Sequence, residues 1–167
     1  NGWNAYVHLP DDYSTTSKNY PVIIFVPGIG EVGTNASLLL VNGPSHFVAQ
    51  GNTMQFMVNG VLEKPIVISI QPPSTWPSAY ALDKEIDSIL FRWRCDPKRI
   101  SLTGLSMGAW GWDNYIGSSS TYASRAASMV VMSAPPTSFS LSNYLWFANS
   151  GSKWWGFEGT HDRKSVV

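Results

Sequence analysis

The sequence predicts one α/β domain, a mostly parallel, doubly wound sheet with helices on both faces. Several short segments are nearly unbroken runs of β-branched and aromatic residues, the pattern of strands that are buried on both faces of a sheet. Segments whose apolar residues recur at helical spacing lie between these runs, and strands that alternate with helices form parallel sheets. The 167 residues fit a single domain, and the sequence contains no internal repeat or linker.

The expected strands follow from their composition. Residues 4–9 alternate apolar and polar side chains, and a Pro-Asp-Asp turn follows them. Residues 21–26 and 65–70 are the apolar runs typical of central strands. A turn at Asp96-Pro97 is expected to lead into the next strand. The later strands are expected at residues 99–103, 128–132 and 153–157.

The expected helices follow from the spacing of apolar residues. They lie at residues 46–50, 78–94, 107–116 and 141–149. The clearest is the second, because its apolar side chains fall on one helical face. Residues 36–61 are otherwise ambiguous, with a loop or short strand expected near residues 54–58. Residues 27–33 contain too many glycines for regular structure.

Composition and charge exclude several classes of protein. The formal net charge is zero and only 13% of the residues are charged, so a role in binding nucleic acid has no electrostatic support. No apolar stretch approaches the roughly 18 residues that a membrane span needs. No Cys/His cluster has the spacing of a metal site, and the glycine-rich loop lacks the Gly-Lys-Ser/Thr ending of a phosphate-binding loop. We therefore expect no metal and no cofactor.

The cysteine and tryptophan content bears on the compartment. The single cysteine, Cys95, excludes an intrachain disulfide and is expected to be a small core residue rather than a thiol nucleophile. Eight tryptophans and few charges fit an exported protein, so a secreted or periplasmic location is expected, with a cytoplasmic one as the alternative. The sequence predicts no particular oligomeric state.

The five residues Gly104-Leu105-Ser106-Met107-Gly108 lie between an expected strand and an expected helix. A serine hydroxyl becomes an effective nucleophile when a sharp turn presents it clear of the sheet, with a base and amide donors in reach. The two glycines remove side chains that would clash where the strand turns into the helix. The pattern predicts Ser106 as a nucleophile; the alternative is a serine in an ordinary strand-to-helix turn.

Three loops are expected at one edge of the sheet. The loop at residues 28–33, the turn at Ser106 and the turn at residues 159–162 each follow the carboxyl end of a strand. In parallel sheets, ligands bind beyond the carboxyl ends of the strands. The sequence therefore predicts a site where these three loops meet.

Several motifs form an ordered series along the chain. They are Leu9-Pro10, Lys18-Asn-Tyr-Pro21, Pro27-Gly-Ile-Gly-Glu31, Gln71-Pro-Pro, Asp96-Pro-Lys-Arg-Ile100, Thr103-Gly-Leu-Ser-Met-Gly108, Arg125-Ala-Ala and Trp155-Gly-Phe-Glu-Gly-Thr-His-Asp162. The series resembles the serine esterases of the α/β-hydrolase fold, and most closely the group of carboxylesterases, feruloyl or acetyl-xylan esterases, polyhydroxyalkanoate depolymerases and predicted peptidases. The resemblance covers residues 6–167 and is specific for the superfamily rather than for one substrate.

The resemblance implies roles for individual residues. Ser106 would be the nucleophile, and Asp162 would be the acid that orients the base. The alternative for Asp162 is a turn or helix cap, for which aspartate is favoured. The backbone N–H groups of Met107 and Ile29 would stabilise the oxyanion that forms on the substrate.

The same edge supplies candidate substrate contacts. Gly30 and Glu31 belong to the glycine-rich loop, and the alternative for Glu31 is a structural hydrogen bond across that loop. Trp76 and Trp110, together with Trp112, are candidates for a platform under a sugar or an aromatic acyl group, because aromatic faces suit such ligands. Core packing is the alternative for each tryptophan.

Two positions depart from the pattern of this group of esterases. Pro27 stands where the group usually has a histidine, and Glu158 stands where a histidine often precedes the glycine of the acid turn. The histidine that the group usually has at the position of Pro27 is mainly structural, so we expect the change to alter the conformation of the loop. Neither change removes a member of the triad.

The general base is not evident in the chain. In this family the histidine follows the acid, whereas His8, His46 and His161 all precede Asp162. His46 is expected to be a surface or capping residue, His8 lies on an early strand away from the site edge, and His161 adjoins the acid at a position that normally points elsewhere. We therefore expect the chain to be part of a longer hydrolase with a histidine beyond Val167, and these 167 residues alone to have little or no activity.

The expected function is that of a serine esterase that cleaves a carboxylic ester through an acyl-enzyme on Ser106. Low net charge and many aromatic residues favour a small-molecule or carbohydrate-linked ester over a phosphorylated substrate. Two alternatives stay open, an acyltransferase or peptidase of the same fold and a non-catalytic, hydrolase-like binding module.

Overall fold

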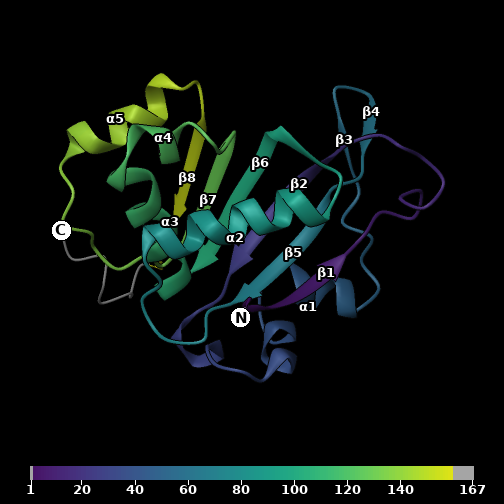
Figure 1. Ribbon diagram of the computed structural model, residues 1–167, viewed down its shortest axis with the longest axis horizontal. Coiled ribbons are helices and arrows are strands. Elements are labelled where there is room, and N and C mark those ends of the chain that lie inside the picture. The colour runs from purple at the N-terminus through teal and green to yellow at the C-terminus, as the bar shows by residue number, and fades with distance from the viewer. Residues whose placement is uncertain (1, 160–167) are drawn as a thin grey trace.

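The computed structural model describes residues 2–159. A six-stranded sheet with the order β1-β5-β2-β6-β7-β8 forms its centre, and helices lie against it (Figure 1). β1 pairs antiparallel with β5, and the other neighbouring strands are parallel. The mostly parallel sheet expected from the sequence is therefore confirmed.

The elements follow the expected alternation of strands and helices. The strands of the large sheet are β1 (Asn4–His8), β2 (Tyr20–Val26), β5 (Ile66–Gln71), β6 (Cys95–Leu105), β7 (Ser128–Met132) and β8 (Lys153–Phe157). A separate hairpin consists of β3 (Phe56–Val58) and β4 (Val61–Glu63). The helices are α1 (Pro44–Ala49), α2 (Ala79–Arg92), α3 (Met107–Ser118), α4 (Ser120–Ala123) and α5 (Leu141–Asn149), with the 3₁₀ turns η1 (Ile29–Glu31) and η2 (Ala36–Leu40).

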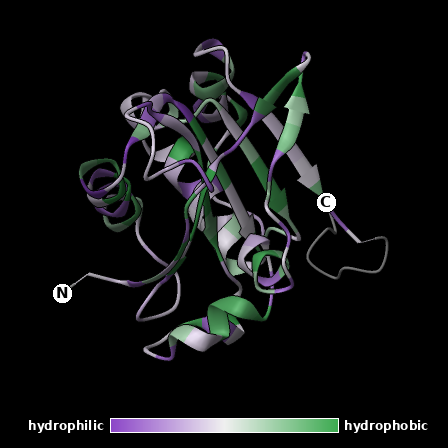
Figure 2. Cartoon of the chain, turned by 90° about the vertical axis from the view of Figure 1, so that its right-hand side faces the viewer, coloured by the Kyte–Doolittle hydropathy of each residue, from purple (hydrophilic) through white to green (hydrophobic). Residues whose placement is uncertain are grey.

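The larger core lies between one face of the sheet and the helices α2 and α3. Val22, Ile24 and Val26 alternate along β2 and are fully buried in this core, because successive side chains of a strand point to opposite faces. The apolar face expected in residues 78–94 supplies Leu82 and Ile86 from α2. Figure 2 shows α2 with hydrophobic as well as hydrophilic residues, as expected for a helix with one face against the core and one toward solvent.

The opposite face of the sheet is covered by α1 and the segment before it. Ser45 of α1 and Ser69 of β5 place their hydroxyl oxygens 2.5 Å apart in a buried contact. Phe25 of β2 is fully buried on this face, close to Gly43 at the start of α1. Helices therefore lie on both faces, as the sequence predicted. Within residues 2–159, no helix has both the length and the apolar character that crossing a membrane requires.

The glycine-rich segment 27–33 was expected to be irregular, but the structure shows a 3₁₀ turn within it. The Glu31 backbone N–H donates to the Gly28 carbonyl at 3.2 Å, and the Gly28 N–H donates to the Glu31 carboxylate at 2.8 Å. This reciprocal pair closes the turn η1. Glycine content alone does not reveal such a pairing.

A short strand, one of the two alternatives expected near residues 54–58, is present as β3 at residues 56–58. It pairs with β4 in a hairpin whose turn residues Asn59 and Gly60 have φ values of 50° and 80°, the paired positive values of a type I′ turn. One boundary differs from the expectation. Asp96-Pro97 was expected to be a turn but lies within β6. Pairing between β2 and β6 continues past the proline through a register shift, so the strand begins at Cys95.

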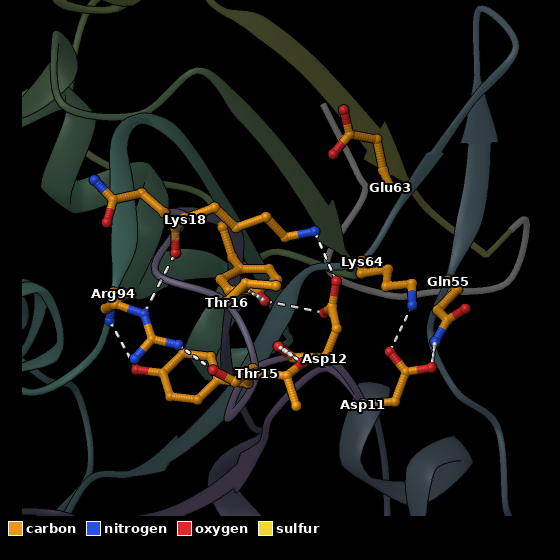
Figure 3. A network of polar contacts seen from close by, with 12 residues as sticks. Asp11, Asp12, Thr15, Thr16, Lys18, Gln55, Glu63, Lys64 and Arg94 are labelled. Carbon is orange, nitrogen blue, oxygen red and sulfur yellow. Dashed lines mark hydrogen bonds and ion pairs between the residues drawn. The ribbon is translucent and has the colours of Figure 1, made fainter.

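A network of polar contacts ties the loop after β1 to the amino ends of the parallel strands (Figure 3). The Arg94 guanidinium lies 3.8 Å from the centre of the Tyr13 ring, and the Arg94 backbone N–H donates to the Tyr13 hydroxyl at 3.0 Å. Lys64 forms an ion pair with Asp11, with a nitrogen–oxygen distance of 2.6 Å. These contacts hold the loop at the end of the sheet opposite to Ser106.

Replacing Arg94 should weaken the fold. Arg94→Ala removes the stacking on Tyr13 and the hydrogen bonds from the guanidinium to the carbonyls of Tyr13 and Lys18. We expect the free energy of unfolding to fall by about 2 kcal/mol, measured by urea unfolding. Arg92→Ala is the control, because Arg92 is exposed at the end of α2 and its loss should matter by no more than about 0.5 kcal/mol. Equal losses in the two variants would contradict the role of Arg94.

Candidate active site

Ser106 alone connects β6 to α3. Its backbone has φ 54° and ψ −114°, a conformation that is strained for a residue with a side chain and costs about 1–3 kcal/mol. The Ser106 N–H donates to the carbonyl oxygen of Met132 at 2.8 Å, so the end of β7 holds the turn in place. The serine therefore sits at a sharp turn at the carboxyl edge of the sheet, as the sequence predicted.

The glycines on either side of Ser106 allow a very close approach of α3 to the sheet. A Cβ atom on Gly108 would lie 2.0 Å from the carbonyl oxygen of Val26, at the end of β2. A Cβ atom on Gly104 would lie 2.5 Å from the carbonyl carbon of Gly108. Both distances are far below contact, so the spacing of these glycines has the steric cause that the sequence suggested.

The glycine-rich loop after β2 lies beside Ser106. A Cβ atom on Gly28 would lie 3.8 Å from the Cβ atom of Ser106. Ile29 and Met107 are the first residues of η1 and α3, positions at which a helix leaves the backbone N–H without a partner in the same helix. The two predicted oxyanion donors, the N–H groups of Ile29 and Met107, therefore each follow one of the two residues in this contact, Gly28 and Ser106.

Glu31 braces the loop. Its side chain is buried, and its two carboxylate oxygens accept hydrogen bonds from the Gly28 N–H, at 2.8 Å, and from the side-chain amide of Asn42. Its backbone carbonyl accepts a hydrogen bond from the Gln71 side chain at 2.8 Å. These contacts favour the structural alternative for Glu31, whereas Gly30 lies in the same turn with open space around its α-carbon. Sequence reasoning missed Asn42, because nothing local marks it as a partner of Glu31.

Two of the three candidate tryptophans lie together near the turn. Trp76 and Trp110 meet edge to face with ring centres 5.1 Å apart, and Trp76 is 47% exposed. The Trp76 backbone N–H donates to the Met107 sulfur at 3.2 Å, which ties this pair to the residue after Ser106. Trp112 is fully buried and its indole N–H donates to a carbonyl of β6, so Trp112 belongs to the core.

The histidines of the described residues are used elsewhere. His8 pairs with Val67 near the amino end of β5, away from the site edge. The two ring nitrogens of His46 lie 2.9 Å from the Leu40 carbonyl and 3.0 Å from the Gln50 side chain. These local contacts fit the capping role expected for His46. The remaining candidates, His161 and Asp162, lie outside the described residues.

Asp113 is an acidic residue that sequence reasoning missed. It lies two turns along α3 from Ser106 and is 9% exposed. Burial raises the pKa of its carboxyl to about 7; a hydrogen bond from the Trp154 indole acts in the opposite direction, and the charge of Glu158 adds to the rise. The sequence did contain a signal, because Asp113 is an acidic residue in the otherwise mostly apolar segment that forms α3.

The sequence-based expectation for Cys95 agrees with its surroundings. The residue is 6% exposed and belongs to the large core. Burial raises the pKa of its thiol to about 12, so the thiol stays protonated and poorly nucleophilic near neutral pH. Cys95 therefore fills space in the core.

The parallel sheet and the serine turn at its carboxyl edge define the class of protein: the chain has the α/β-hydrolase fold. Neither a protein-family model nor a curated protein matches the chain. Many solved structures do, including several esterases of this fold.

Three of these structures show the extent of the likeness. A thermostable esterase matches with TM-score 0.58 and 19% identity over 94% of this chain, which spans 51% of that esterase. FphF of Staphylococcus aureus, a fluorophosphonate-binding serine hydrolase, matches with TM-score 0.61 and 15% identity over 95% of this chain and 73% of its own. The S-formylglutathione hydrolase FrmB of Staphylococcus aureus matches with TM-score 0.59 and 15% identity over 95% and 71%. At these identities the likeness establishes the fold.

Adding one methyl group at residue 108 should disrupt the turn. Gly108→Ala would bring a carbon atom to 2.0 Å from the Val26 carbonyl oxygen, so α3 must shift, and we expect a loss of stability of about 3 kcal/mol or more. Thermal unfolding measures the change. Gly30→Ala is the control, because a Cβ atom there meets nothing within 4 Å. A Gly108→Ala protein as stable as the Gly30→Ala protein would contradict this steric account.

Replacing Asp113 should change the pH dependence of stability. With a folded-state pKa of about 7 and an unfolded value near 3.9, the folded state keeps a proton that the unfolded chain has lost. The free energy of unfolding should therefore fall by up to about 4 kcal/mol as the pH rises from about 4 to 7. Above pH 7 it should stay at the lower value.

Asp113→Asn removes this titration while keeping an acceptor for the Trp154 indole. The variant should melt at a higher temperature than the parent at pH 8, and the gain should disappear toward pH 4. Asp11→Asn, which changes a carboxylate on the opposite side of the molecule whose pKa Lys64 lowers, should give no such gain. Failure of Asp113→Asn to stabilise the protein at pH 8 would refute this assignment.

Proposed function

We propose that the chain is the catalytic domain of a serine hydrolase that cleaves carboxylic esters, with Ser106 as the nucleophile. The observation that carries this proposal is the strained backbone of Ser106, φ 54° and ψ −114°, at the junction of β6 and α3. Strain of this kind persists where the surrounding structure maintains it, and it concentrates at functional sites. The esterases among the structures of the same fold support a hydrolase function in general.

The proposed reaction begins when the Ser106 hydroxyl oxygen attacks the ester carbonyl while its proton passes to the base. The negative charge that develops on the carbonyl oxygen is stabilised by the backbone N–H groups of Met107 and Ile29; the loss of one such donor typically costs about 3–4 kcal/mol. The carbon–oxygen bond to the alcohol then breaks, and the alcohol takes the proton from the base. Water hydrolyses the acyl-enzyme and restores the serine.

The base in this proposal is a histidine other than His8 and His46, because both are engaged away from Ser106. We assign it to a segment that follows Asp162 in the full-length protein, with the Asp162 carboxylate fixing its tautomer. This order, in which the serine precedes the acid and the acid precedes the histidine, is the order of the α/β-hydrolases.

The proposed substrate is a neutral small-molecule or carbohydrate-linked ester. The edge-to-face pair of Trp76 and Trp110 offers an aromatic surface, and such surfaces bind sugar rings and aromatic acyl groups. The Trp76 backbone N–H contacts the sulfur of Met107, the residue after the nucleophile. A ferulic acid esterase and an acetyl xylan esterase from Aspergillus awamori are among the structures of the same fold. Gly30, with open space around its α-carbon, completes the proposed substrate side of the site, and the buried Glu31 supports the loop that carries it.

A fluorophosphonate probe tests the nucleophile directly, because it labels only activated serines. In the full-length protein we expect labelling and hydrolysis of a short-chain aryl ester, and Ser106→Ala should lower both by at least about 10³-fold. Ser101→Ala is the matched control, because Ser101 lies on the same strand but bonds to Ser128, and it should keep both signals.

Two outcomes would overturn the proposal. Labelling that persists in Ser106→Ala would place the reactive serine elsewhere. A complete absence of labelling and turnover would favour the non-catalytic, hydrolase-like binding module. Transfer of the acyl group to an added alcohol in preference to water would identify an acyltransferase on the same serine.

A further inference from the structure

A cavity lies apart from the serine turn, lined by residues of α3, α5 and β8. Figure 1 shows these three elements together on one side of the molecule. The volume of the cavity is about 740 Å³, within the range of small-molecule sites. Apolar side chains line most of it, among them Ile116 from α3 and Leu141 and Leu145 from α5. The lining includes neither Ser106 nor the tryptophan pair beside it, so this cavity is distinct from the candidate active site.

One carboxyl group stands in this apolar lining. Asp113 is 9% exposed and lines the cavity, and the Trp154 indole N–H donates to it. Glu158 lies close enough for its charge to act on Asp113. Within the part of the chain that the structure describes, the lining contains no lysine, arginine or histidine, and the ion pairs use other carboxylates. Asp113 is therefore the charged group of the lining within residues 2–159.

Aromatic side chains stand beside the same carboxyl. Tyr144 and Trp154 line the cavity, and the pKa of the Tyr144 hydroxyl is raised by burial and by the charge of Asp113. Rings of this kind attract cations to their faces, most strongly where water is excluded. A neutral ligand would leave the carboxylate poorly solvated, and an anionic ligand would be repelled by it.

We propose that the cavity between α3, α5 and β8 binds an organic cation with an apolar body. The ammonium group lies at Asp113 among the rings of Tyr144 and Trp154, and the hydrocarbon part lies against Leu141 and Leu145. Carboxylate and ring faces together recognise the charge, while the apolar wall selects against small inorganic cations. The proposal concerns binding alone and does not depend on the activity of Ser106.

Three ligands of equal chain length test the charge preference: hexylammonium, 1-hexanol and hexanoate. Calorimetric titration at pH 8 should show hexylammonium binding at least about tenfold more tightly than 1-hexanol, with hexanoate the weakest. Asp113→Asn should reduce the difference between hexylammonium and 1-hexanol to less than about twofold. Asp11→Asn removes one negative charge from the opposite side of the molecule and should leave the difference unchanged.

A second variant tests the location. Leu145→Lys should place a positive charge at the lining and weaken the binding of hexylammonium at least about tenfold, while circular dichroism confirms that each variant is folded. Equal affinity for hexylammonium and 1-hexanol, or a charge preference that survives Asp113→Asn, would overturn the proposal. Unchanged binding in Leu145→Lys would place the ligand elsewhere and overturn it too.

Discussion

The contact between the start of α3 and the end of β2 is the constraint on which the site depends. A side chain at residue 108, the second residue of α3, would collide with the Val26 carbonyl, so the first turn of the helix fits here only with a glycine at that position. Because the helix begins so close to the sheet, one residue has to turn the chain, and Ser106 does so at a φ of 54°. The adjacent end of β7 then accepts the Ser106 N–H. Steric exclusion and one hydrogen bond together maintain a backbone conformation that an isolated serine would leave.

The fold could largely be predicted from the sequence, because the periodicity of apolar residues is a local property. The elements Ser128–Met132, Leu141–Asn149 and Lys153–Phe157 occupy the residues expected for them. The brace of Glu31 could not be predicted, since its partners Asn42 and Gln71 come close only after the sheet has formed. Local sequence indicates which segments can be strands, but not which distant side chains meet.

The candidate site likewise combines a local motif that could be predicted with contacts between distant residues that could not. The turn at Ser106 was predictable because both glycines and the serine lie within five residues. Trp112 and Trp76 have the same side chain, yet α3 directs one into the core while the other lies exposed in a loop. Residue type does not separate these cases, and neither does the element, because Trp110 also lies on α3 and yet pairs with Trp76. Burial depends on the direction in which the folded backbone points each side chain. Asp162 lies outside the described residues and stays a prediction.

The hydrogen bond from Ser106 to Met132 also affects the order in which the protein folds. α3 is a local structure and can form early, whereas pairing of β6 with β7 must bring together segments that are separated by α3 and α4. Until β7 joins the sheet, this hydrogen bond cannot form, and the positive φ of Ser106 is less strongly maintained. The backbone conformation that presents the Ser106 side chain is therefore completed only when β7 has joined the sheet.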